Sequence, residues 1–127
     1  MEKMENITES TIQKVVNQFY TQVRNDPLLA PVFEQAIGTE TSDWLPHLER
    51  MYAFWSSVML ASRRYQGNPF LKHKELPPFD IKLFDRWLEL FTSTVEEIHT
   101  SEIAALYIQK SRQIAQSLKY GLYSTFR

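Results

Sequence analysis

The chain has 127 residues with 14 Lys and Arg against 15 Asp and Glu, and it contains no cysteine. Its length fits one domain with a single core, and its balanced charge, without blocks of like sign, offers no surface for nucleic acid or an anionic membrane. The lack of cysteine excludes disulfides, thiolate metal sites, cysteine nucleophiles and cofactors attached through thioethers.

The chain lacks the roughly 18 consecutive apolar residues that a membrane-spanning helix needs, and residues 1–5 are too polar for a secretion signal. We therefore expect a cytoplasmic protein in which residues 1–127 form one domain and residues 1–9 a flexible N-terminal extension. Eight Phe, six Tyr and three Trp provide apolar area that either fills a core or lines a large flat ligand. Without thiolates, any cofactor must be held noncovalently by nitrogen or oxygen ligands.

The first predicted helix covers about residues 11–25. Ser10 and Gln13 form a capping box at its start, and Asn25-Asp26-Pro27 ends it. Residues 28–36 are expected to form a short helix or turn that carries Phe33, and residues 38–42 form a loop. The apolar positions of the first helix recur every three or four residues, and they are Ile12, Val15, Val16, Phe19, Tyr20 and Val23.

A longer helix is predicted from Asp43 to about Leu60. Pro46 falls in its first turn, where the missing N–H is tolerated. Residues 61–68 are expected to form a second loop. The apolar stripe of this helix has helical spacing and consists of Trp44, Leu48, Met51, Trp55 and Val58.

A very short helix around His73 follows this loop. Asn68 can cap its start and Pro69 suits its first position, whereas Pro77 and Pro78 cannot continue a helix. About two turns remain by the usual rise and pitch. Such a helix is marginal alone, so something in the folded protein must hold it, and a bound cofactor is one candidate.

Two further helices complete the chain. Asp80 can cap the first of them, residues 99–101 break the pattern, and His99 at this break is expected to be solvated. The last helix is predicted over about residues 102–122. The buried stripe of the earlier helix consists of Phe84, Trp87, Leu88, Phe91, Val95 and Ile98, and that of the later one of Ile103, Tyr107, Ile114, Leu118 and Leu122. The sequence therefore predicts an all-α fold.

Four polar side chains within these patterns are candidate site residues. His47 shares a helix face with Met51 and other apolar residues, so it is either a histidine satisfied at the core edge or one that faces a ligand. Tyr20 and Trp87 are either core packing or buried donors that need an acceptor. A capping or solvated role for His73 leaves its stiff flanking prolines unexplained. Two histidines on separate helices suit the opposite faces of a planar metal cofactor.

The chain resembles the truncated haemoglobins, and specifically their third group, from about Ile12 to Tyr123. Its content of three glycines is similar to that group and unlike the glycine pairs of the other two. The resemblance is carried by Phe19-Tyr20, Phe33 after Pro31-Val32, His47 with Met51 and Phe54-Trp55, the run His73-x-x-Leu76-Pro77-Pro78-Phe79, and Trp87 followed by Leu88-x-Leu90-Phe91. It implies a single globin domain, folded as a two-over-two helical sandwich around haem.

The resemblance also implies roles for individual residues. His73 is similar to the proximal ligand of the iron in noncovalent haem b, and Tyr20 and Trp87 would donate hydrogen bonds to a bound gas. His47 resembles the distal histidine of some members, which gates access, donates a hydrogen bond or binds iron. Met51 stands where the family more often has a branched aliphatic residue. Arg50 and Lys72 would pair with the haem propionates, and the cavity walls would be Phe33, Trp55, Leu76 and Phe79.

The expected function is reversible binding and transport of oxygen, with nitric oxide and carbon monoxide as further diatomic ligands. Two alternatives remain open. One is a haem enzyme that oxidises nitric oxide or activates peroxide, with electrons from an unidentified reductase, because strong donors also polarise an O–O bond. The other is a cofactor-free helical module that binds a partner through its aromatic surface.

Overall fold

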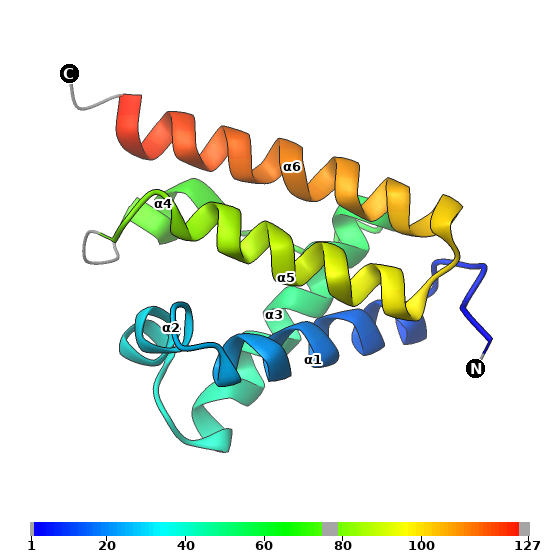
Figure 1. The fold of residues 1–127 in the computed structure, drawn as a ribbon, viewed down its shortest axis with the longest axis horizontal. Coiled ribbons are helices and arrows are strands. Elements are labelled where there is room, and N and C mark those ends of the chain that lie inside the picture. The colour runs from blue at the N-terminus through cyan, green and yellow to red at the C-terminus, as the bar shows by residue number, and fades with distance from the viewer. Residues whose placement is uncertain (1, 75–78, 125–127) are drawn as a thin grey trace.

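A computed structural model describes residues 2–74 and 79–124, and these residues form six helices (Figure 1). They contain no β structure apart from one isolated bridge between Met4 and His99. The all-α prediction is confirmed. None of the described helices is long and apolar enough to cross a membrane. The helices are α1 (Glu9–Asn25), α2 (Ala30–Ile37), α3 (Thr41–Leu60), α4 (Pro69–Lys74), α5 (Leu83–Ile98) and α6 (Ser101–Ser124).

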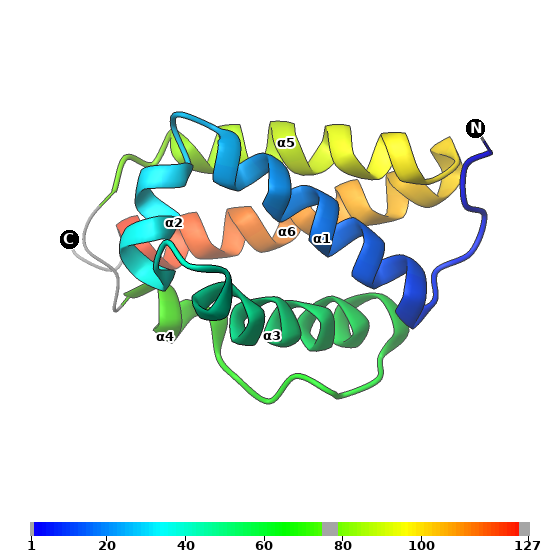
Figure 2. The same ribbon diagram turned by 90° about the horizontal axis from the view of Figure 1, so that it is seen from below.

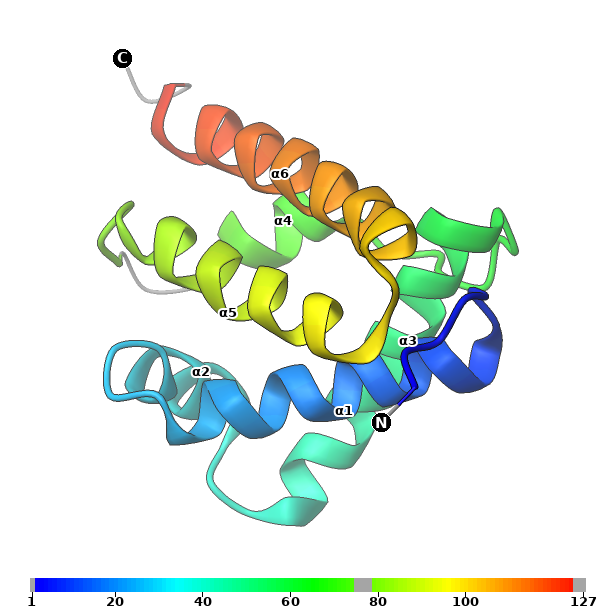
Figure 3. The same cartoon turned by 45° about the vertical axis from the view of Figure 1, so that its right-hand side comes forward.

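The long helices pack as two pairs, which is the predicted two-over-two arrangement. Helices α5 and α6 run antiparallel, whereas α1 packs on α3 and also lies against α5 (Figures 1 and 3). The short helix α2 contacts both α1 and α3, and the short helix α4 packs on α6. Figure 2 shows α2, α4 and the start of α3 together at one end of the molecule.

Two hydrophobic clusters hold these helices together. The main core is formed mostly by α1, α3, α5 and α6, and burial of each large apolar side chain is worth about 1.5–3 kcal/mol. A smaller cluster lies where α4 meets α5 and α6. The main core includes Ile12, Val16, Phe19, Val23, Trp44, Trp55, Phe91, Val95 and Tyr107, and the smaller one includes Phe70, Phe79, Phe84, Ala115 and Leu118.

The start of α1 differs from the prediction. The hydroxyl oxygen of Thr8 accepts a hydrogen bond from the backbone N–H of Thr11 (3.1 Å), and the hydroxyl oxygen of Thr11 accepts one from the N–H of Thr8 (2.9 Å). This capping box starts the helix at Glu9, so the box predicted from Ser10 and Gln13 is wrong. Two threonines at the required spacing serve as well as the serine and glutamine pair.

Two other helix starts also lie a few residues from their predicted positions. Helix α3 begins at Thr41, so Asp43 is its third residue. The carboxylate of Asp43 accepts a hydrogen bond from the backbone N–H of Glu40 (3.1 Å). Asp80 accepts from the N–H of Lys82 (2.9 Å) and shapes a turn, and α5 begins at Leu83. Acidic side chains therefore stabilise both starts, from within the helix in one case and from the preceding turn in the other.

His99 is fully buried, so the prediction that it is solvated is wrong. Its Nδ1 lies 2.9 Å from the carbonyl oxygen of Met4, and its ring stacks on that of Tyr107. The backbone of Met4 also donates to Ile98 (2.8 Å) and accepts from Thr100 (3.1 Å). The N-terminal segment therefore covers the turn between α5 and α6. The expected flexibility of residues 1–9 in solution stays a prediction.

A buried carboxylate joins α1, α2 and α5. One oxygen of Asp26 accepts hydrogen bonds from the backbone N–H groups of Leu28 (3.2 Å) and Leu29 (3.0 Å). The other accepts from Nε (2.9 Å) and Nη2 (2.6 Å) of Arg86. The hydrogen bonds from Arg86 and from the two backbone groups hold the pKa of Asp26 below its ordinary value, against the opposing effect of burial.

We predict that Asp26→Ala lowers the free energy of unfolding at pH 7 by about 1–3 kcal/mol, because a buried carboxylate loses several hydrogen bonds. A carboxyl with a lowered pKa in the folded state stabilises the fold above its unfolded pKa, and this contribution disappears as the pH falls through the folded pKa. Urea unfolding should therefore show the difference narrowing below about pH 4. Asp85→Ala, at an exposed carboxylate, is the control. An equal loss from both variants would contradict the prediction.

Candidate functional site

Helix α4 presents His73 from a preorganised start. The side-chain oxygen of Asn68 accepts a hydrogen bond from the backbone N–H of Leu71 (3.2 Å), and Pro69 is the first helical residue, which confirms the local prediction. His73 is half-buried, and its Nδ1 lies 2.7 Å from the carbonyl oxygen of Pro69. A carbonyl only accepts, so Nδ1 carries the proton and Nε2 keeps the lone pair that a metal needs.

His47 lies on α3 among aromatic rings. Its ring meets that of Tyr20 edge-on (centroids 4.9 Å apart) and that of Trp44 in the same way (5.7 Å). Its Nε2 is buried and has no hydrogen-bond partner in the part of the chain that the structure describes. Buried polar atoms almost always have a partner, and one without a partner costs stability. This atom is therefore suited to a ligand.

Burial is the main reason that the ring of His47 is neutral. Burial first, and then the electrostatic effects of Arg50 and His73, lower its pKa to about 4. At neutral pH the ring therefore carries one N–H and one lone pair. The electrostatic effect of His73 also shows that the two histidines, although they come from different helices, lie within range of each other.

Tyr20 provides a second polar group beside His47. Its side chain is 6% exposed and also contacts the rings of Phe33 (5.9 Å) and Trp44 (5.8 Å). Burial raises the pKa of its hydroxyl, so this group stays protonated and can donate. A donor and a neighbouring imidazole are thus both available to the same ligand.

The rings of Trp87 and Trp55 both stack on the ring of Phe91. The ring of Trp87 stacks on Phe91 (5.4 Å) and meets Phe19 edge-on (5.5 Å). Trp55 is 3% exposed, stacks on Phe91 (4.8 Å) and lies in the main core. The stack links α1, α3 and α5 next to the Tyr20 cluster, because Phe19 also contacts Tyr20 (4.9 Å).

The remaining predicted residues are more dispersed. Phe79 packs on Phe84 (5.6 Å) in the smaller cluster, and Met51 is half-buried against the main core. Arg50 and Lys72 are exposed. Leu76 lies outside the described residues.

Sequence reasoning missed Trp44 as a site residue. It is fully buried, contacts both Tyr20 and His47, and donates its indole N–H to the carbonyl oxygen of Gly38 (3.0 Å). Its position three residues before His47 places both side chains on one helix face, which is the signal that could have identified it. Gly38 adopts a φ of +125°, a value that favours glycine.

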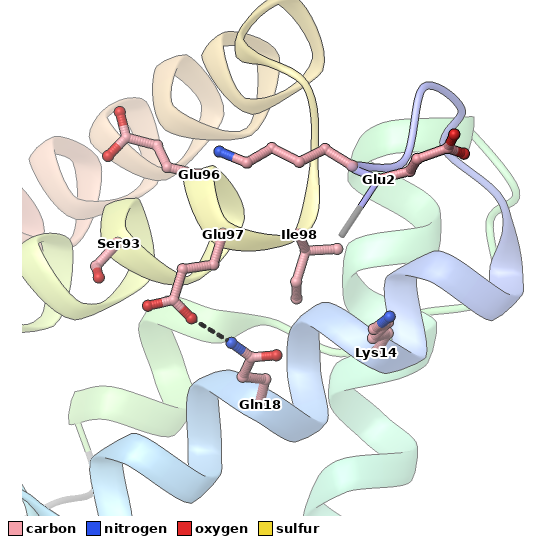
Figure 4. Close-up of a pocket in the computed structure, with 8 residues that line it drawn as sticks. Glu2, Lys14, Gln18, Ser93, Glu96, Glu97 and Ile98 are labelled. Carbon is pink, nitrogen blue, oxygen red and sulfur yellow. Dashed lines mark hydrogen bonds between the residues drawn. The ribbon is translucent and has the colours of Figure 1, made fainter.

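A surface pocket of about 570 Å³ lies elsewhere, between α1, α5 and the N-terminal segment (Figure 4). Gln18 points toward Glu97 across it and donates a hydrogen bond (2.6 Å). The pocket shares no residue with the histidine and aromatic cluster. Its polar side chains are mostly exposed and of both charges, so it lacks the buried, convergent polar groups of a ligand site. The lining residues are Glu2, Lys3, Lys14, Gln18, Ser93, Glu96, Glu97 and Ile98.

The two histidines, His47 and His73, and the aromatic residues around His47 are of the kinds that hold a haem. Within the described ranges, no group of three or more His, Asp or Glu could hold a metal ion by itself. Haem iron needs only one protein ligand, because the porphyrin supplies four nitrogens. His73, with Nδ1 on a backbone carbonyl, could supply that ligand, and Nε2 of His47 is a buried polar atom without a partner among the described residues. Phe33 and Trp44 add apolar surface beside them.

Comparisons with known proteins identify a family and relatives that the chain resembles. A family model described as bacterial-like globin matches residues 4–118. The chain is 35% identical over 121 residues to a group 3 truncated hemoglobin of Campylobacter jejuni, with 95% of each chain covered. It is also similar to the crystal structure of a group III truncated hemoglobin from Campylobacter jejuni, with a TM-score of 0.93, 34% identity and 96% of both chains covered.

Proposed function

The chain belongs to the bacterial-like globins, as a group 3 truncated haemoglobin, and we propose that it is a cytoplasmic protein that reversibly binds and carries oxygen. In this proposal, noncovalent haem b supplies an iron centre at which oxygen, nitric oxide or carbon monoxide binds. His73 holds the iron, and Tyr20 with His47 provides hydrogen bonds to the gas. The observation that carries the proposal is the buried Nε2 of His47, which has no hydrogen-bond partner among the described residues, on a ring that contacts Tyr20 and lies within electrostatic range of His73.

His73 is prepared for ligation by its backbone contact. The hydrogen bond from Nδ1 to the carbonyl of Pro69 selects one tautomer, fixes the ring orientation and raises the basicity of Nε2. No transfer of a proton between the two ring nitrogens is needed before Nε2 binds metal. The capped start of α4 at Asn68 limits the motion of the same short helix.

Tyr20 and His47 act as preorganised donors. Their rings are held by edge contacts with each other and with Trp44, so little ordering is needed when a ligand arrives. Negative charge that develops on a bound oxygen molecule is stabilised by such donors in a site with little water. Trp87 would provide a third donor, and Met51 would shape the access route through its flexible thioether. We expect these contacts to slow the release of oxygen.

Further residues would complete the cofactor site. Arg50 and Lys72 are exposed cations that suit the haem propionates, although exposed pairs are usually worth less than about 1 kcal/mol each. We propose the aromatic and aliphatic side chains of Phe33, Trp55, Leu76 and Phe79 as the cavity wall.

The visible absorption spectrum of the purified protein tests this function. We expect a strong Soret band in the ferric form that shifts on reduction and again on addition of carbon monoxide. A reduced spectrum that is already six-coordinate without gas would assign His47 as an iron ligand. A colourless protein that is fully folded and takes up no added haemin would refute the proposal in favour of a cofactor-free helical module.

A second candidate function is the oxidation of nitric oxide by oxygen in the same pocket. It is favoured by the adjacent hydroxyl of Tyr20 and imidazole of His47, because donors that retain oxygen also polarise its O–O bond. Repeated turnover needs an electron donor, supplied in the cell by a reductase. Stopped-flow mixing of the oxygen-loaded protein with nitric oxide, followed by an assay with a chemical reductant, separates a single reaction from catalysis.

A further inference from the structure

Helix α6 approaches α4 closely at Gly121. A Cβ atom placed on Gly121 would lie 2.6 Å from Cε1 and 2.7 Å from Cδ1 of Phe70. Carbon atoms in favourable contact are about 3.5–4.0 Å apart, so any side chain at this position would push the ring away by about 1 Å. Glycine within a helix is less stable than alanine, which makes this position unfavourable for α6 alone. Its advantage is the close contact with Phe70.

Phe70 attaches α4 to the smaller hydrophobic cluster. Helix α4 has only six residues, and a helix of that length is not stable without tertiary contacts. It packs on α6, and Figure 3 shows it behind α5 and α6. The Phe70 ring lies in the smaller hydrophobic cluster with Phe84, Ala115 and Leu118. The position of this ring therefore determines where α4 lies.

His73 follows Phe70 by three residues, so both side chains lie on neighbouring parts of one helix face. The hydrogen bond from His73 to Pro69 joins the imidazole to the residue next to Phe70. A shift of Phe70 that displaces the backbone of this six-residue helix is therefore expected to move the imidazole as well. Movement of Phe70 is transmitted to His73 through the one helical turn that separates them.

We propose that Gly121 is a positioning residue for the proximal ligand: its lack of a side chain lets Phe70 seat against α6 and thereby sets the distance of His73 from the haem. This inference rests on the proposed role of His73 as the iron ligand. Gly121 itself touches neither haem nor gas and acts through Phe70.

The test compares Gly121→Ala with wild type and with Gly67→Ala. Gly67 lies just before α4, and an added Cβ there lies as close to Oη (2.5 Å) and Cζ (2.7 Å) of Tyr65, a ring that packs on Phe54 of α3, so this variant introduces a similar clash away from α6. We expect Gly121→Ala to shift the iron–histidine stretching band in resonance Raman spectra of the reduced protein. Loss of haemin to an apomyoglobin acceptor should be about 10-fold faster or more, as for other changes that disturb ligand orientation. Gly67→Ala should resemble wild type in both measurements.

A compensating substitution separates positioning from general instability. Phe70→Leu in the Gly121→Ala background removes the clashing ring atoms, and it should return the stretching band toward the wild-type frequency. Amide exchange of α4 in the apoprotein supplies a readout that needs no haem, with faster exchange expected in Gly121→Ala and slower exchange in the double variant. An unchanged band and unchanged exchange in Gly121→Ala would overturn the inference. A wild-type protein without His-ligated haem would instead refute the proposed function.

Discussion

Replacing His73 with alanine is expected to abolish stable haem binding. The structure gives His73 a protonated Nδ1 that is hydrogen-bonded to Pro69 and an Nε2 with a lone pair, the arrangement of a metal-binding imidazole. Loss of the ligand should exceed the effect of disturbing a ligand's hydrogen bond, so haem affinity should fall by at least about 100-fold. Titration of the apoprotein with haemin, followed at the Soret band, measures this change.

A matched control for this variant is Leu71→Ala, because Leu71 lies on the same short helix and is 52% exposed. It should bind haem as wild type does. Added imidazole should partly restore the spectrum of the reduced His73→Ala protein, since it can occupy the space left by the side chain. Unaltered haem affinity and an unaltered spectrum in His73→Ala would refute the assignment of this residue as the ligand.

Replacing Tyr20 with phenylalanine is expected to speed oxygen release by about 10- to 100-fold, as for loss of a hydrogen bond to a group that carries charge. The hydroxyl of Tyr20 stays protonated because burial raises its pKa, so it donates throughout the neutral range. Carbon monoxide accumulates less negative charge than oxygen, and its release should change less. Flash photolysis and stopped-flow replacement of oxygen by carbon monoxide provide both rates.

Tyr52→Phe is the control for the loss of a tyrosine hydroxyl. The hydroxyl of Tyr52 donates to the side chain of Asn17 on α1, away from His47, so its removal should leave oxygen release unchanged. Combining Tyr20→Phe with His47→Leu measures whether the two polar groups act on the same ligand. Equal oxygen release rates in wild type and Tyr20→Phe would show that Tyr20 is packing alone.

Local signals in the sequence predicted the helices well. The capped start at Asn68-Pro69 was correct because it depends on neighbouring residues only, and the apolar stripe of α1 was correct because periodicity reports the buried face. Errors arose where two neighbouring pairs of residues could each cap the same helix. The capping box of α1 is formed by Thr8 and Thr11 and not by Ser10 and Gln13.

The sequence predicted which residues belong to the candidate site, but not how their side chains are arranged. Tyr20 and His47 were identified individually, but their ring contact joins α1 to α3 and does not follow from spacing along the chain. Trp44 was missed because a tryptophan in an apolar stripe resembles core packing, and only the packed structure shows that it supports both residues.

The sequence by itself determined the helical class, the position of His73 on a short proline-flanked helix, and the candidate polar residues, because each depends on local chemistry and periodicity. Only the tertiary structure decided the burial of His99 by Met4, 95 residues away, and the pairing of Asp26 with Arg86, 60 residues away. It likewise decided the contact of Phe70 with Gly121. The physical reason is that these partners are selected by how the helices pack, and short-range propensities carry no information about contacts between distant segments.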